Sequence, residues 1–308
     1  MADGILVSTI VSTVQAGTPL ALAAMGELIV ERSGVLNLGV EGMMLVGAVA
    51  GFITAVVTGS PALGMMAAIL AGALMSLLFA FITQHLIANQ VATGLALTIF
   101  GTGLSAFMGK SYTGISLPGV AAWHLPVLSD LPFVGKVLFS YDPLVYVSWL
   151  SALGLYIYLY RSRSGLKLRA VGESPDVAHG LGYPVVRMRY LAILFGGGLA
   201  GLGGAYLSVV YTPLWQEGMV AGRGWIALAL VVFATWRPGL VLVGAYLFGF
   251  LTVFQYQGQS MGLGIPPDFL AMLPYLITIV ALVFISMDRT RVLLNTPVSL
   301  GKSFHPTT

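Results

Sequence analysis

Long apolar runs separated by short polar connections fill most of this 308-residue chain. A membrane-spanning helix needs about 20 mostly apolar residues, and runs near that length recur from one end of the sequence to the other. The pattern predicts nine spans, at residues 5–29, 38–57, 62–85, 91–108, 143–160, 190–211, 225–236 (the core of the seventh span), 240–254 and 269–286. We therefore expect an all-α polytopic membrane protein, with broken helices and a single transmembrane domain over residues 1–308.

The longest polar stretch runs from Arg161 to Arg189 and separates the first five spans from the last four. It holds six of the 14 Lys and Arg residues, grouped at its two ends. Because Lys and Arg near the ends of spans resist translocation, such a loop stays in the cytoplasm. Threading the spans from this loop puts the C-terminal tail, residues 288–308, inside the cell and the N-terminus outside. Eleven basic residues then lie on the cytoplasmic side and three outside, which supports the topology.

A short helix is predicted inside this polar stretch. Ser174 can cap it, Pro175 suits its first turn and Asp176 complements the helix dipole. Gly180 or Gly182 can end it. A short capped helix on a cytoplasmic loop suits the docking of a soluble partner, and an ordinary amphipathic connector fits the local sequence equally well. A second short helix is predicted on the surface within the long external loop, residues 110–142.

Composition excludes a soluble protein. Hydrophobic residues make up 57% of the chain and charged residues 8%, against roughly 25% charged residues in soluble proteins. The net charge of +3 does not indicate nucleic-acid binding, because the basic residues lie at helix ends and not on one face. The absence of Cys excludes a disulfide framework or a thiolate metal site and fits a bacterial cytoplasmic membrane. The N-terminus lacks a basic region before its apolar run, so we interpret it as the first span and not as a signal peptide.

Residues 27–47 are the most unusual apolar stretch, because three Glu, one Arg and one Asn interrupt it. Gly34 and Gly39 would break a helix here, as in the discontinuous segments that line transporter sites. Glu31 and Arg32 are interpreted as interfacial and solvated. Glu41 either faces a path or stabilises the broken helix, since a carboxylate at membrane depth needs a partner.

The triplet Glu41–Met43 recurs as Glu217–Met219, each time at the start of an apolar run. In the predicted topology the two runs cross the membrane in opposite directions. The recurrence is therefore compatible with an inverted repeat or with coincidence.

A translocation path is predicted from polar and aromatic residues in or near the spans. Amides and aromatic faces suit a neutral polar solute with a flat ring, although interhelical hydrogen bonding or interfacial anchoring explains any single one of them better. The candidates are Asn37, Glu41, Asn89, Gln90, Trp215, Glu217 and Gln255. Neither a nucleophile–base pair nor metal-ligand spacing is recognisable, so the sequence predicts no catalytic site.

Glycines within the spans are interpreted as helix-packing positions. Gly47 and Gly51, and Gly197 and Gly201, have the four-residue spacing of close helix contacts. Residues 196–201 match GxGxxG but lie inside a span, where a dinucleotide site is not expected. Residues 103–111, GLSAFMGKS, have five residues between the glycines where a phosphate-binding loop has four. We therefore expect no ATPase site in this chain.

Three blocks resemble permease subunits of bacterial ABC importers in the branched-chain amino acid, ribose and nucleoside group. Residues 31–48, ERSGVLNLGVEGMMLVGA, are similar to the family signature, and residues 168–185, LRAVGESPDVAHGLGYPV, to its coupling-helix region. Residues 221–239, AGRGWIALALVVFATWRPG, resemble a third block. The resemblance is greatest to the nucleoside and simple-sugar branch, which uses basic membrane lipoproteins as receptors. Thr235 and Trp236 depart from it, because a small residue and a basic residue are expected there.

The resemblance implies one of two homologous permeases that together enclose a path through the inner membrane. A cytoplasmic ABC ATPase, which binds the ATP and Mg, would dock on the loop helix, and an external lipoprotein would deliver the small polar solute. The solute it implies is a nucleoside, with a simple sugar as the alternative; no nucleic acid and no cofactor in this chain are expected. A channel would need a charged ring or a filter-like loop, and a scaffold would not need broken, acid-bearing spans. The docking residues implied are Gly172, Glu173, Ser174, Pro175, Asp176, Ala178, Gly180 and Gly182.

Overall fold

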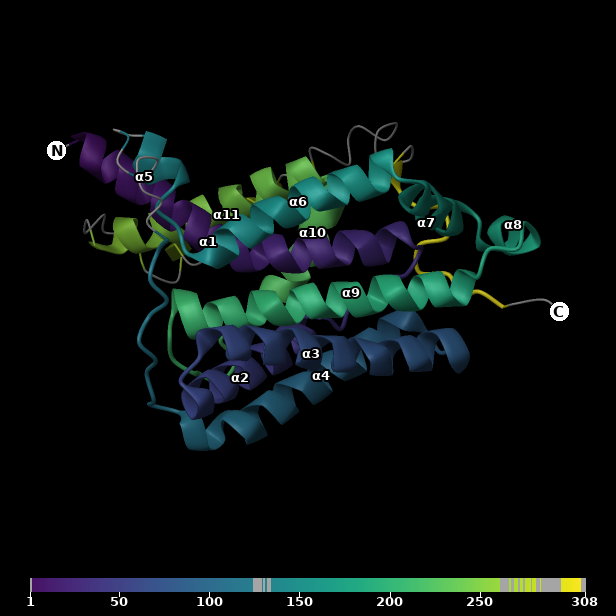
Figure 1. Ribbon diagram of the computed structural model, residues 1–308, viewed down its shortest axis with the longest axis horizontal. Coiled ribbons are helices and arrows are strands. Elements are labelled where there is room, and N and C mark those ends of the chain that lie inside the picture. The colour runs from purple at the N-terminus through teal and green to yellow at the C-terminus, as the bar shows by residue number, and fades with distance from the viewer. Residues whose placement is uncertain are drawn as a thin grey trace.

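The fold is a bundle of long helices that run roughly parallel to its longest axis (Figure 1). It is described from a computed structural model, which covers residues 2–123, 134–260 and 295–305 and isolated residues between these ranges. The helices are α1 (Ala2–Arg32), α2 (Val40–Thr58), α3 (Pro61–Ala80), α4 (Gln90–Gly109), α5 (Val134–Leu138), α6 (Pro143–Arg161), α7 (Arg163–Glu173), α8 (Pro175–Gly180), α9 (Val185–Ala205), α10 (Arg223–Phe233) and α11 (Pro238–Ser260). Turns of π-helix extend α3 over Phe81–His85 and α9 over Tyr206–Tyr211.

Helix α1 forms the centre of the bundle. It packs against α6, α9, α10 and α11, and α9 lies between it and the layer formed by α2 and α3 (Figure 1). Its side chains from Leu20 to Val30 are buried on every face. A helix that is apolar nearly all round is typical of such a central position.

The two ends of the bundle are built differently. The N-terminus and α5 lie at one end, called the α5 end below. Helices α7 and α8 and the C-terminal residues lie at the opposite end, called the α8 end (Figure 1). Because α5 falls between residues 110 and 142, it confirms the short surface helix predicted in that loop.

Glycines allow α2, α3 and α9 to pack backbone against backbone. A Cβ atom at Gly47 of α2 would overlap the backbone of Gly201 of α9, and a Cβ atom at Gly72 of α3 would overlap the carbonyl oxygen of Gly197. Small residues that let helices approach closely are a common device of membrane proteins. The packing role predicted for the spaced glycines is confirmed.

Among the described residues, seven helices are long and apolar enough to cross a membrane. They confirm the first six predicted spans and the eighth. The seventh, with its core at residues 225–236, corresponds to α10, which has 11 residues and a length of about 16 Å, against about 30 Å of hydrocarbon. The structure therefore does not confirm it as a continuous helical span. Of the ninth, residues 269–286, the structure describes ten residues, all of them helical, and the others lie outside the described residues.

The polar stretch between α6 and α9 is shorter and more structured than predicted. Helix α9 begins at Val185, five residues before the predicted start, so Arg187 and Arg189 belong to the helix and not to the loop. Helix α7 occupies the first part of the stretch, where Gly165 N donates to Ser162 Oγ at 2.9 Å as an N-terminal cap. The sequence of α7 is amphipathic, and its apolar face buries Leu168 against the bundle. This pattern indicates a helix that the sequence analysis did not predict.

Candidate functional site

Buried polar side chains hold the break between α1 and α2. Asn37 N donates to Glu27 Oε1 at 3.2 Å, and Gly39 N donates to Asn37 Oδ1 at 3.0 Å. Leu36 N donates to Gln90 Oε1 at 2.8 Å. These bonds satisfy backbone donors that an interrupted helix leaves without partners. The predicted broken segment is confirmed, and Asn37 and Gln90 stabilise it.

Glu41 caps the N-terminus of α10. Its two carboxylate oxygens accept from Gly222 N at 2.8 Å and from Gly224 N at 2.6 Å. The free N–H groups and the dipole at a helix N-terminus favour a negative charge there. Glu41 is 6% exposed, and a Cβ at Gly224 would lie 2.5 Å from Glu41 Cα. Glu41 thus stabilises the start of α10, and its assignment to a path stays a prediction.

Helix α10 is confined to the α8-end half of the bundle. Its N-terminus lies at Glu41, near the start of α2, and Trp236, just past its C-terminus, lies at the end of α1. Trp236 Nε1 donates to Glu31 Oε2 at 2.6 Å, and Arg32 Nη2 donates to Trp236 O at 3.1 Å. The segment between α9 and α11 is therefore a discontinuous span. Helix α10 covers one half of the bundle, and the irregular residues 212–222 cover the rest.

Glu31 and Arg32 are buried, whereas the sequence led us to expect that both would be solvated. They are 1% and 6% exposed. Trp236 covers Glu31, and Asn295 O accepts from Arg32 Nη1 at 3.0 Å. That prediction is wrong, because segments about 200 and 260 residues away in the chain cover the end of α1. Trp236 has a positive φ of 54°, a strained conformation for a bulky residue that these hydrogen bonds hold in place.

The other predicted path residues lie apart from the break. Asn89 is exposed and caps α4, accepting from Ala92 N at 3.0 Å. Trp215 is buried against α2, Glu217 is exposed, and Gln255 is half-buried on α11. The structure thus brings Asn37, Glu41, Asn89 and Gln90 to the starts of α2 and α4 and disperses Trp215, Glu217 and Gln255. Their assignment to a solute path stays a prediction.

The two Glu-Gly-Met triplets occupy different surroundings. Glu41 to Met43 open α2 and are buried, whereas in the turn before α10 Glu217 and Gly218 are exposed and Met219 is half-buried. The inverted repeat stays a prediction.

The short helix predicted in the polar stretch is confirmed as α8. Val177 N donates to Ser174 Oγ at 3.5 Å, Pro175 is its first residue and Gly180 its last. Gly182 has a φ of +83°, a conformation that favours glycine and that ends the helix as a cap.

One face of α8 packs on the bundle and the other is free. Ala178 joins Val171, Val185 and Phe304 in a small apolar cluster. On the outer side, Glu173 and Asp176 are exposed, and the side chains of Val177 and Leu181 are 63% and 71% exposed.

Gly172, at the junction with α7, touches the carbonyl of Arg32 so closely that a Cβ there would overlap it. The junction is therefore fitted tightly to the end of α1.

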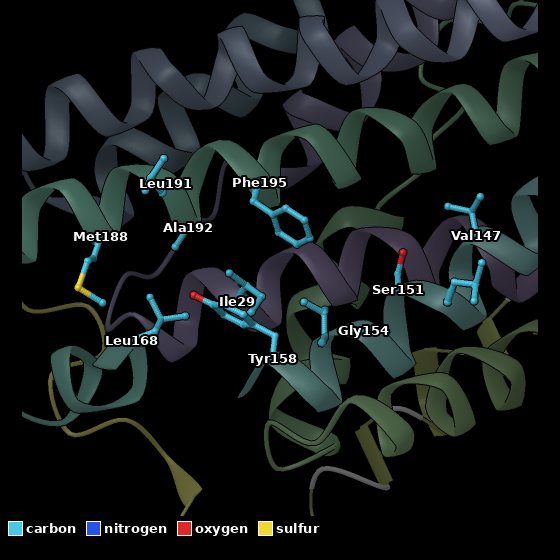
Figure 2. A pocket seen from close by; sticks show the side chains of 12 residues that line it. Ile29, Val147, Ser151, Gly154, Tyr158, Leu168, Met188, Leu191, Ala192 and Phe195 are labelled. Carbon is cyan, nitrogen blue, oxygen red and sulfur yellow. The ribbon is translucent and has the colours of Figure 1, made fainter. Parts of the chain in front are cut away.

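A cavity of about 650 Å³ lies between α6 and α9, with α1 as its floor (Figure 2). Ile29 of α1, Gly154 of α6 and Phe195 of α9 line it, and Leu168 of α7 borders it toward the α8 end. Apart from Ser151 and Tyr158, its lining residues are apolar. Such a lining suits hydrocarbon, so this cavity does not supply the polar path that the sequence predicted.

At the α5 end, Asp142 ties α6 to the π-helical turn after α9. Its carboxylate accepts from Leu144 N at 3.0 Å and from Tyr206 Oη at 2.9 Å. Burial raises the pKa of the Asp142 carboxyl above its ordinary value, and the hydrogen bond from Tyr206 opposes the rise. Among the residues that the structure describes, no three His, Asp or Glu side chains form a group that could hold a metal ion.

Sequence reasoning missed two buried polar residues at the α8 end. Arg189 had been counted as a loop charge, and Ser299 as part of a polar tail; both are buried, Arg189 completely. A signal for Arg189 was available, because Val185, Arg189 and Ile193 follow one another at helical spacing and Val185 and Ile193 are apolar. Nothing in the sequence around Ser299 indicates its burial.

This helical bundle, with its broken spans and its projecting helix pair, is the architecture of a transporter permease. The family model described as "Branched-chain amino acid transport system / permease component" matches residues 9–282. The chain belongs to this family of ABC transporter permeases.

Two curated relatives support the assignment, and one solved structure shares the fold. A candidate glucose ABC transporter permease, TsgC13 of Haloferax volcanii, is 43% identical, with 96% of both chains covered. The nucleoside ABC transporter permease NupC of Lactococcus lactis is 34% identical, covering 86% of this chain and 88% of its own. A solved chain described as an inward-facing conformation of a candidate metal-chelate type ABC transporter has a TM-score of 0.52 at 18% identity, covering 90% of this chain and 84% of that one. This last match shows a shared fold only.

Proposed function

We propose that the chain is the membrane-spanning permease subunit of an ATP-driven importer in the cytoplasmic membrane. It pairs with a second homologous permease to enclose the path. A separate ABC ATPase binds ATP and Mg in the cytoplasm, and an external solute-binding lipoprotein delivers the solute. The α8 end faces the cytoplasm in this proposal, because it carries most of the basic residues of the polar stretch.

The surface of α8 carries the proposal. This helix projects beyond the spans at the end of the bundle (Figure 1), and it presents two largely exposed apolar side chains, Val177 and Leu181. Exposed apolar residues rimmed by charges are typical of a docking site for a protein partner. Because Ala178 on the opposite face packs into the bundle, a push on α8 reaches the spans as a rigid-body movement.

The solute is a nucleoside or a simple sugar in this proposal. The sequence favoured a nucleoside, and NupC supports it. The more similar relative, TsgC13, is named for glucose, which supports a monosaccharide more strongly than the sequence did. Both classes share a polyhydroxylated ring, so either would need hydrogen-bonding groups in the path.

The test is ATP hydrolysis by the complete importer, reconstituted in liposomes with its second permease, its ATPase and its receptor. We expect a purine or pyrimidine nucleoside, or a monosaccharide such as glucose, to raise the ATPase rate severalfold and to accumulate in the liposomes. Stimulation by nucleosides alone would identify the first class, and stimulation by monosaccharides alone the second.

A matched pair of variants separates docking from folding in this assay. Leu181→Asp places a charge on the exposed face of α8, and Leu166→Asp makes the same change at the 60% exposed Leu166 of α7. We expect the first to lose ATPase binding and the second to retain it. No ATP-dependent uptake of either solute class by the wild-type complex would refute the proposed function.

A further inference from the structure

Residues 295–305, called the C-terminal clasp below, pack into the α8 end instead of extending into solvent. Ser299 and Phe304 are 4% and 6% exposed. The clasp lies beside the end of α7, the break between α1 and α2, and the start of α4. It adds bonds to the direct contacts that these elements make through Gly172 with Arg32 and through Leu36 with Gln90. A polar tail without a role in the fold would be expected to stay solvated.

Ser299 is the centre of the clasp. Its backbone N donates to Gly172 O at 3.0 Å and its Oγ donates to the same oxygen at 2.6 Å. Gly172 is the penultimate residue of α7, directly before α8. The clasp is therefore bonded twice to the junction between α7 and α8, the helix that presents the docking surface.

Arg189 fastens the same serine to the break. Its guanidinium donates to Ser299 Oγ at 3.3 Å, to Ser33 O at 3.2 Å and to Lys302 O at 3.4 Å. The side chain is fully buried. A buried cation is costly unless its donors are satisfied, so Arg189 favours the one arrangement in which the clasp and the break supply these oxygens.

The bonding continues on both sides of Ser299. Gly301 N donates to Gly34 O at 3.2 Å, inside the break, and Gln90 Nε2 donates to Lys302 O at 3.3 Å, at the start of α4. Gly34 has a φ of +86°, and a Cβ there would overlap Ser299 Oγ. The break and the clasp are therefore in contact without an intervening side chain.

Phe304 extends the contact to α8 itself. It packs with Val171, Ala178 and Val185, and its ring lies 5.6 Å from the ring of His179. The clasp therefore touches α7, α8 and α9 together with the break at which α2 begins.

We propose that the C-terminal clasp is a rigid strut that makes the α7–α8 pair and the α1–α2 break move as one body, with Arg189 and Ser299 as its positioning residues. This inference rests on the proposed function, since α8 must receive the movement of the ATPase. The strut carries that movement to Glu27, Asn37 and Glu41, the buried polar residues of the broken segment. Without it, ATP hydrolysis would continue but would move the break less effectively.

The first test is the number of solute molecules imported per ATP hydrolysed by the reconstituted importer. Ser299→Ala removes the two Oγ bonds but keeps the backbone bond to Gly172. Val298→Ala, at a side chain 63% exposed on the same segment, is the matched control. Two lost hydrogen bonds predict a fall of about fivefold or more in the import ratio of Ser299→Ala, with ATPase binding retained and the control unchanged.

A second test asks whether the strut stays attached during transport. The chain has no Cys, so Val298→Cys with Glu173→Cys introduces one pair of exposed thiols, each next to a partner of the Ser299–Gly172 bond. Because Glu173 borders the docking surface, the reference is the same double variant after reduction. We expect cross-linking to leave the uptake equal to that of the reduced form, because the two segments move together. Loss of uptake on cross-linking, restored by reduction, would overturn the rigid strut.

The outcomes separate this inference from the proposed function. If wild-type protein transports and Ser299→Ala imports as much solute per ATP as Val298→Ala, the strut is refuted while the importer stands. A variant that loses thermal stability and ATPase binding together would show a purely structural role and also overturn it. If the wild-type complex shows no ATP-dependent uptake, the proposed function itself fails.

Discussion

Most of the buried charged side chains that the structure describes have backbone hydrogen-bond partners. Glu41 accepts from two backbone N–H groups of the α10 N-terminus, and Glu27 accepts from Asn37 N. Arg189 donates to two carbonyl oxygens and one hydroxyl. In a bilayer a free backbone polar group costs several kcal/mol, and each of these side chains lies where a helix is interrupted or ends. These charged side chains thus supply hydrogen-bond partners for irregular backbone inside the bundle.

Replacement of Glu41 by Gln tests this at a single residue. The amide keeps one acceptor oxygen and turns an N–H₂ group toward a backbone N–H, so one donor at the α10 N-terminus loses its partner. We expect Glu41→Gln to lower stability by about 1–3 kcal/mol, measured by thermal unfolding in detergent.

Glu217→Gln is the control for this change, because Glu217 has the same Glu-Gly-Met context but is exposed. Equal melting temperatures for the two variants would contradict the capping role of Glu41.

At the scale of elements, two features decide how the helices meet. Glycine faces bring α2, α3 and α9 together, and Trp236, three residues past the end of the half-helix α10, is hydrogen-bonded to Glu31 and Arg32. A helix of 11 residues gains little from local propensity alone. Its position depends on the cap by Glu41 at one end and on the Trp236 contacts at the other.

The glycine contacts predict a large effect from one added methyl group. A Cβ at Gly201 would overlap the carbonyl oxygen of Ala68, whereas a Cβ at Gly103 of α4 meets nothing within 4 Å. We expect Gly201→Ala to lower stability by about 1–3 kcal/mol through overpacking, and Gly103→Ala to leave it unchanged or raise it. Thermal unfolding in detergent measures both, and a stable Gly201→Ala protein would show that α9 can move away from α3.

At the scale of the whole molecule, the proposed function requires that the α8 end faces the cytoplasm. The absence of Cys allows single cysteines to report it. We expect a maleimide that cannot cross the membrane to label Lys136→Cys at the α5 end of intact cells. It should label Val177→Cys on α8 only after permeabilisation. Labelling of Val177→Cys from outside would place the docking surface on the wrong side and end the importer proposal.

Local signals were enough for most of the individual elements. The length of the apolar runs determined seven spans, Gly34 and Gly39 marked the break, and Ser174 and Pro175 marked the start of α8. Each of these depends on residues within one or two helical turns. The prediction failed for Arg189 because a charge beside a polar loop has the same local pattern whether it is solvated or buried.

The sequence by itself thus determined the membrane class, the family and the places where helices start and stop, because apolar length and capping act over short distances along the chain. Only the tertiary structure decided that Glu41 caps α10, that Trp236 covers Glu31 and that residues 295–305 clasp the α8 end. These contacts join residues about 130 to 260 positions apart. Whether a polar group is buried, and by what, depends on how distant segments pack, and that information is absent from any local pattern.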